Sequence, residues 1–148
     1  MDESRGAPPS GSRAPALRAA HGAVVACAVS AGVHAGLVPE HLQTEPREGV
    51  AFIVAAVLLL AVAGGLTARP DNPYLAGIAA LLFAGLIFAY VATRTRGIPW
   101  LAPDRESLDT LGVATNVVEA VGFVLASHRL LKPPGERHQR QTPQEVTR

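Results

Sequence analysis

Apolar residues in this chain are gathered into long continuous blocks, without the period-two or period-3.6 alternation of a soluble domain. Two of these blocks contain no charged residue: 50–68 reads VAFIVAAVLLLAVAGGLTA, and 74–93 reads YLAGIAALLFAGLIFAYVAT. A helix needs about 20 mostly apolar residues to cross the hydrocarbon core of a bilayer. Both blocks therefore predict transmembrane helices.

Two further blocks are interrupted by polar residues, and we still expect them to span. The block 19–38 contains two histidines, and the block 108–127 contains an aspartate, an asparagine and a glutamate. Apolar residues of the last block point all round the helix, which is typical of a span and unlike a helix lying on the membrane surface. The pattern predicts an all-α, four-helix antiparallel transmembrane bundle over 17–131, with disordered tails at 1–16 and 132–148.

The connections between the predicted spans are short and contain helix breakers. The first, 39–48, contains two prolines, and the second, 69–73 (RPDNP), has room only for a tight turn. The third, 94–107, contains Trp100, a residue type that anchors spans at the membrane interface. Nine Lys and Arg residues fall in the tails and the second connection, against four in the first and third. Because positive charge marks the cytoplasmic side, we expect both termini inside.

Composition narrows the function classes. The chain is 49% hydrophobic and 17% charged, whereas a soluble domain carries about 25% charged residues. The net charge of +1 gives no argument for a nucleic-acid partner. The single cysteine excludes an intramolecular disulfide and a cysteine metal cluster. No phosphate-binding glycine loop, zinc-protease motif or nucleophile elbow is present in the sequence, so a membrane enzyme stays open as an interpretation but has no motif to support it.

Polar residues inside the predicted spans are the candidate functional residues, because each is costly in a bilayer and needs a partner or a purpose. In the first span, Cys27, Ser30 and His34 are spaced three and four residues apart and so share one helix face. In the last span, Asn116 and Glu119 share a face in the same way. We expect these two faces to pack against each other.

The helical rise of about 1.5 Å per residue predicts which of these residues lie at the same depth. Measured inward from the predicted outer ends, Ser30 falls level with Asn116, and His34 falls level with Gly112, where a glycine would let the backbones approach. Glu119 lies one turn deeper, close to the midplane and level with the cysteine. A polar clamp between helices is the structural interpretation, and a proton relay or a ligand site is the functional alternative.

A second polar cluster begins at the outer end of the first span. His34, His41 and Glu45 combine imidazole and carboxylate groups, which suit a transition metal such as zinc, iron or copper. Their spacing matches no tight ligand motif, so solvated loop charges are the alternative interpretation. A transition metal is therefore a candidate cofactor only if these side chains converge.

Two stretches resemble small four-span actinobacterial integral membrane proteins. Residues 34–42 (HAGLVPEHL), followed by Glu-Pro and a glycine that opens a span, are similar to the first loop of these proteins. Residues 94–99 (RTRGIP) and 111–119 (LGVATNVVE) resemble their end. The resemblance covers about 20–130. It implies four spans in a bacterial plasma membrane and associates the first-loop His/Glu cluster with Glu119, but it supplies no reaction.

The sequence therefore predicts a multi-pass integral membrane protein and leaves three interpretations of its function open. The first is a structural or accessory membrane protein with an outward-facing polar His/Glu cluster. The second is a metal- or small-ligand-binding membrane protein, and the third is a small proton-coupled transporter that uses Glu119. Its expected partners are the lipid bilayer and either further copies of the chain or a larger membrane complex.

Overall fold

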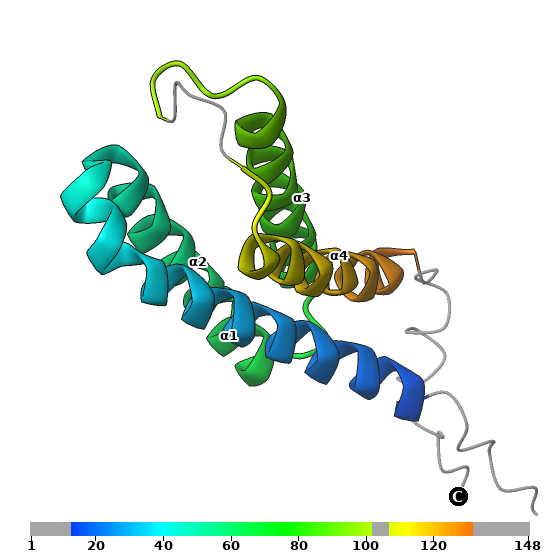
Figure 1. Ribbon diagram of the computed structural model, residues 1–148. Coiled ribbons are helices and arrows are strands. Elements are labelled where there is room, and N and C mark those ends of the chain that lie inside the picture. The colour runs from blue at the N-terminus through cyan, green and yellow to red at the C-terminus, as the bar shows by residue number, and fades with distance from the viewer. Residues whose placement is uncertain (1–12, 102–106, 132–148) are drawn as a thin grey trace, which may run out of the picture.

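The computed structural model describes residues 13–101 and 107–131, with side chains from residue 18 onward. These residues form the helices α1 (Arg13–Thr44), α2 (Pro46–Ala68), α3 (Pro73–Thr95) and α4 (Thr110–Leu130), and the described part of the chain contains no strand (Figure 1). All four helices are long and apolar enough to cross a membrane. The predicted all-α, four-helix transmembrane fold is confirmed. The predicted tails, 1–16 and 132–148, lie outside the described residues except where α1 begins.

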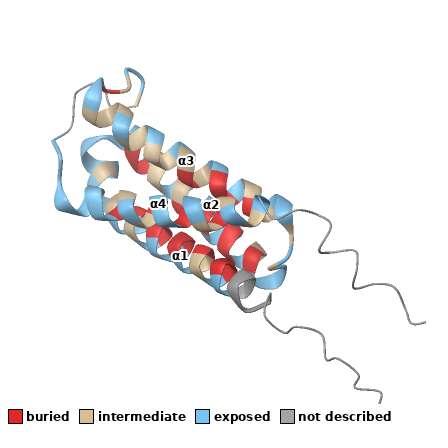
Figure 2. Ribbon diagram, turned by 90° about the vertical axis from the view of Figure 1, so that its right-hand side faces the viewer, coloured by how far each residue is buried: buried red, intermediate tan, exposed pale blue. Residues whose placement is uncertain are grey.

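Helix α1 packs along α2 and against α4, and α3 packs along α4, whereas α2 and α3 make few contacts (Figure 1). Figure 2 shows the buried positions on the sides of the helices that face one another. Much of this interior is built from small side chains, which allow helix backbones to approach closely in a membrane. The buried small residues of α1 and α4 are Ala19, Ala20, Ala23, Ala26, Cys27, Ser30, Ala31, Thr115, Gly122 and Ala126.

The connection between α1 and α2 differs from the prediction. Helix α1 continues through Pro39 to Thr44, and α2 begins at Pro46, so the single residue Glu45 lies between them. Proline removes one backbone donor from a helix. Here the side chains of His41 and Thr44 bond to backbone carbonyls one turn earlier, which supports the last turn beyond the proline. The expected loop 39–48 is therefore largely helical.

A glycine closes the corner between these two helices. Gly49 is buried, and a Cβ atom at this position would lie 2.7 Å from the backbone nitrogen of Leu42. Only glycine allows the first turn of α2 to lie this close to the end of α1. We call this end of the bundle, where α1 joins α2 and α3 leads to α4, the Glu45 end.

The opposite end contains the predicted tight turn. Helix α2 ends where the Arg69 N–H donates to the Gly65 carbonyl at 2.8 Å, and α3 begins at Pro73. The side chain of Asn72 caps α3 by accepting a hydrogen bond from the Tyr74 N–H at 2.9 Å. An asparagine cap followed by proline at the first helical position is a strong helix start. The two helices diverge from this turn toward the Glu45 end.

Candidate ligand-binding cavity

All four helices contribute to a cavity of about 520 Å³ that lies toward the Glu45 end. Its apolar walls include Phe52 of α2, Leu86 of α3 and Leu111 of α4. Its ionisable lining residues are His34, His41, Glu48, Tyr90, Arg94, Asp109 and Glu119. A space of this size, with apolar walls and a few polar groups, has the build of a small-molecule site.

Glu119 lies at the inner end of this cavity. It is 1% exposed, and it is the lining residue of α4 farthest from the Glu45 end. The Ser30 hydroxyl of α1 donates a hydrogen bond to Glu119 Oε1 at 2.8 Å. The expectation that the polar faces of α1 and α4 pack against each other is confirmed by this bond between buried side chains.

The register between α1 and α4 differs from the one predicted. Ser30 was expected level with Asn116, but its partner is Glu119, which lies one helical turn farther along α4. The depth count started at the predicted end of the first span, residue 38, whereas α1 continues to Thr44. The observed partner lies three residues beyond the predicted one, and the six residues by which α1 extends past residue 38 are more than enough to account for this difference.

Gly112 permits a close approach, but to a different helix from the one predicted. A Cβ atom on Gly112 would lie 2.7 Å from Cε2 of Tyr90, on α3. The expected neighbour, His34 of α1, is not among the atoms in closest contact with this position. Because a Cβ atom here would meet the Tyr90 ring, the glycine allows α3 and α4 to lie close together at this depth, where both residues line the cavity.

The His34 side chain continues the polar row that starts at Glu119. Its Nδ1 lies 2.9 Å from the Ser30 carbonyl oxygen, and its ring meets Phe52 edge-on at 5.5 Å between centroids. A carbonyl oxygen can only accept, so Nδ1 carries the proton and Nε2 is the acceptor of the neutral ring. The three residues Glu119, Ser30 and His34 therefore present a carboxylate and an imidazole acceptor in one region of the bundle.

A second imidazole–carboxylate pair lies nearer the Glu45 end. His41 Nε2 is 3.6 Å from Glu48 Oε2, and the Glu48 residue is 7% exposed. The His41 ring also meets Phe52 edge-on, at 4.7 Å between centroids. The apolar ring of Phe52 thus contacts both imidazoles of the cavity, His34 and His41.

The proposed metal ligands do not form a cluster. His34 and His41 line the cavity, but Glu45 is exposed in the link between α1 and α2 and is not part of the lining. Within residues 13–101 and 107–131, no three His, Cys, Asp or Glu side chains come together as they would around a metal ion. Metal binding by these three residues stays a prediction without geometric support.

The wall formed by α3 and α4 carries an ion pair that the sequence did not suggest. Arg94 Nη2 lies 2.9 Å from Asp109 Oδ2, and the guanidinium lies over the Tyr90 ring at 4.7 Å from its centroid. Asp109 caps α4 by accepting from the Gly112 N–H at 2.6 Å. This backbone hydrogen bond, together with Arg94, holds the pKa of Asp109 below its usual value. The Tyr90 hydroxyl is buried and makes no hydrogen bond to the described residues.

The remaining predicted polar residues lie in different surroundings. Asn116 lines the cavity and donates from Nδ2 to the Gly112 carbonyl at 3.4 Å. Cys27 is fully buried in the apolar core and does not line the cavity. Asn116 is therefore available to a ligand, and Cys27 is a packing residue.

Tyr90 and Arg94 had one sequence signal, their spacing of four residues on one face of the third span.

No known protein family matches this chain, and comparison with curated proteins and with solved structures finds no similar protein. The chemistry of the cavity is therefore the basis on which a function can be assigned. Four apolar helices make the chain compatible with a multi-pass membrane protein. The buried polar groups then indicate what such a protein could bind.

Proposed function

We propose that this chain is a multi-pass protein of a bacterial plasma membrane that binds a small amphiphilic cation in the cavity at its Glu45 end. The observation that carries the proposal is Glu119, a fully buried carboxyl group at the inner end of a cavity with apolar walls. A carboxylate has about four acceptor sites, and Ser30 donates to one of its oxygens. A cationic ligand would supply the charge that a buried carboxylate needs.

The charge balance of the lining supports a cation over an anion. Among the described lining residues, Glu48, Asp109 and Glu119 are carboxylates, and Arg94 is the basic residue besides two histidines. Arg94 is paired with Asp109. The carboxylates in excess are thus the two buried ones, and they lie beside the apolar walls that would take the uncharged part of the ligand.

The test uses three ligands of one shape and different charge: benzylamine, benzyl alcohol and benzoate. We expect benzylamine alone to raise the thermal stability of the full chain in mild detergent. A ligand at 100 times its Kd stabilises the native state by about 2.7 kcal/mol. Glu119→Gln should remove this effect, while Glu40→Gln, at an exposed carboxylate outside the lining, should keep it. Equal stabilisation by the three compounds would reject a cation site.

Sidedness is part of the same proposal. The excess of Lys and Arg in the tails and in the turn at 69–73 supports a cytoplasmic location for both termini, so that the cavity faces outward. Reporter fusions after Arg69 and at the C-terminus should read cytoplasmic, and a fusion at Gln43 should read external. A C-terminus on the external side would contradict four crossings with both ends inside.

A proton-coupled transporter is the second candidate, supported by the continuous row from Glu119 through Ser30 to His34. Rows of ionisable residues inside a membrane protein are typical of proton pathways. Vesicles that contain the chain should then show a faster benzylamine-dependent pH change than vesicles that contain Glu119→Gln, as reported by a pH-sensitive dye in the lumen. Uncharged benzylamine that crosses the bilayer by itself changes the pH equally in both. Binding of benzylamine with equal pH changes in the two preparations would favour the binding protein over the transporter.

A further inference from the structure

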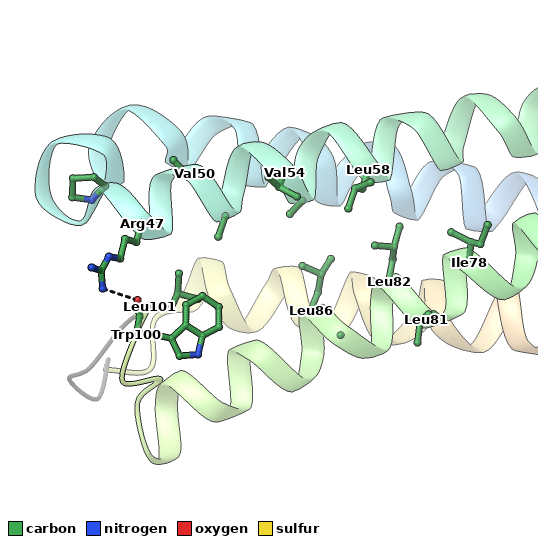
Figure 3. Close-up of a pocket in the computed structure, with 14 residues that line it drawn as sticks. Arg47, Val50, Val54, Leu58, Ile78, Leu81, Leu82, Leu86, Trp100 and Leu101 are labelled. Carbon is green, nitrogen blue, oxygen red and sulfur yellow. Dashed lines mark hydrogen bonds between the residues drawn. The ribbon is translucent and has the colours of Figure 1, made fainter.

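A second cavity, of about 1060 Å³, lies between α2 and α3 where the two helices diverge (Figure 3). The first cavity has charged and imidazole side chains among its apolar walls, whereas the walls of this one along both helices are apolar apart from Arg47 at one end. They are formed mainly by Val50, Val54 and Leu58 of α2 and by Ile78, Leu82 and Leu86 of α3. Val54 is 51% exposed and Leu58 is 44% exposed, so the space is a groove open to the surroundings of the bundle. We call it the α2–α3 groove.

The length of this groove fits one leaflet of a bilayer. Between Arg47 and Leu58, α2 advances by about 16 Å at about 1.5 Å per residue. Half of a hydrocarbon core of about 30 Å is about 15 Å. A lipid chain that starts at the Glu45 end would therefore lie against the apolar walls over the depth of its own leaflet.

The groove ends in a polar rim at the Glu45 end. Arg47 Nη1 donates to the Trp100 carbonyl oxygen at 3.1 Å, and Figure 3 shows both side chains at this end of the groove. Both residues are exposed. The bond uses one of the five N–H donors of the guanidinium. Arginine binds phosphate through several such donors, and tryptophan is enriched at the depth of lipid headgroups.

We propose that the α2–α3 groove binds an anionic glycerophospholipid, with an acyl chain along the apolar walls and the phosphate at Arg47. The rim favours this occupant over a second copy of the chain. A lipid phosphate supplies the counter-charge for Arg47, whereas another apolar helix face would cover the guanidinium without pairing it. The groove adjoins the cavity that contains Glu119, because Ala51, Ala55, Leu86 and Leu101 line both. The lipid proposal rests on Arg47 and Trp100, which do not line that cavity, and it does not depend on the function proposed for it.

The chain offers matched variants for a test. Gly85 lines the groove, and no heavy atom lies within 4 Å of the position that its Cβ would take, so Gly85→Phe should fill the groove without a clash. Gly64 has the same open surroundings and does not line the groove, so Gly64→Phe is its control. Arg47→Ala removes the charge at the rim, and Arg69→Ala removes an exposed arginine at the other end of α2.

The readout is the fluorescence of Trp100, the single tryptophan of the chain. The full chain is placed in phosphatidylcholine vesicles, into which phosphatidylglycerol or phosphatidylcholine with brominated acyl chains is titrated as a quencher. An arginine near the surface contributes about a fivefold preference for an anionic lipid. We expect half-maximal quenching at about one fifth as much phosphatidylglycerol as phosphatidylcholine, with no such difference in Arg47→Ala.

Gly85→Phe should lower quenching by both lipids, and the two control variants should behave like the unaltered chain. Equal quenching by the two lipids in the unaltered chain would overturn the proposal. So would unchanged quenching in Gly85→Phe, or an equal loss in Gly64→Phe. Quenching that falls as the protein density in the vesicles rises, together with cross-linked dimers, would assign the groove to a second copy and also overturn it.

Discussion

Removing the Ser30 hydroxyl isolates the contribution of the bond between α1 and α4. Ser30 and Glu119 are 0% and 1% exposed, and the 2.8 Å hydrogen bond joins them between the two helices. Ser30→Ala leaves a buried carboxyl oxygen without this donor, which costs about 1–3 kcal/mol in proteins generally. Hydrogen bonds between membrane helices average about 0.6 kcal/mol and reach about 1.7 kcal/mol. Because both groups are fully buried, we expect a loss of about 1–2 kcal/mol.

A double-mutant cycle combines Ser30→Ala with Glu119→Leu. In the Glu119→Leu background, Ser30→Ala should cost less stability than it does in the unaltered chain. When Glu119 is replaced, the Ser30 hydroxyl can still bond to a backbone carbonyl of its own helix. Losing its partner therefore costs the serine less free energy than it costs the buried carboxyl group. Unfolding of the single and double variants by dodecyl sulfate in mixed micelles measures each free energy. We expect a coupling of about 1–2 kcal/mol between the two positions. Thr67→Val, whose hydroxyl bonds to the Ala63 carbonyl, is the remote control and should add to Glu119→Leu without coupling.

Strict additivity of Ser30→Ala and Glu119→Leu would refute this reasoning. The hydrogen bond would then contribute nothing to the stability of the bundle. A coupling as large for Thr67→Val would instead indicate a general effect of Glu119→Leu on the fold.

Two further predictions concern packing and capping. Gly122→Leu should destabilise the bundle by about 1–3 kcal/mol, because a Cβ there would lie 2.5 Å from Cζ of Phe83, whereas Gly85→Leu should be nearly neutral; micelle unfolding compares the two. The pKa of Asp109 is lower in the folded chain than in the unfolded chain, so its ionised form stabilises the fold. This contribution is complete above the unfolded pKa of about 3.9 and is lost as pH falls through the lower folded pKa. Asp109→Asn should therefore be less stable than the unaltered chain at neutral pH and equal to it at the lowest pH. A stability difference that is the same at every pH would contradict stabilisation by the ionised carboxylate through the Gly112 N–H and Arg94.

The spans were predictable because the cost of placing charge in a bilayer leaves a strong pattern. The uncharged blocks 50–68 and 74–93 agree closely with α2 (Pro46–Ala68) and α3 (Pro73–Thr95). The end of α1 was not predictable in the same way. Proline ends most helices, and nothing in the local sequence indicates that the turn after Pro39 is held by side-chain bonds and by the corner glycine.

The residues that line the cavity were predictable only where a polar residue interrupts an apolar span. Ser30, His34 and Glu119 stand out because they interrupt apolar spans, and the structure brings all three together. Tyr90 and Arg94 lie near the end of a span, where both residue types are usual, so sequence alone did not distinguish them from interface anchors. Their position beside the cavity depends on the rotation of α3 about its axis, which is set by packing against α4.

Helix faces and helix register differ in how well a sequence determines them. The face that carries Ser30 and His34 follows from their spacing of four residues, which holds wherever the helix begins or ends. Register is counted from a helix end, and one turn of about 5.4 Å corresponds to fewer than four residues. The extension of α1 to Thr44 is therefore enough to exchange Asn116 for Glu119 as the partner of Ser30. A polar contact between two spans is thus predictable as a pair of faces, whereas its partner residues require the true ends of both helices.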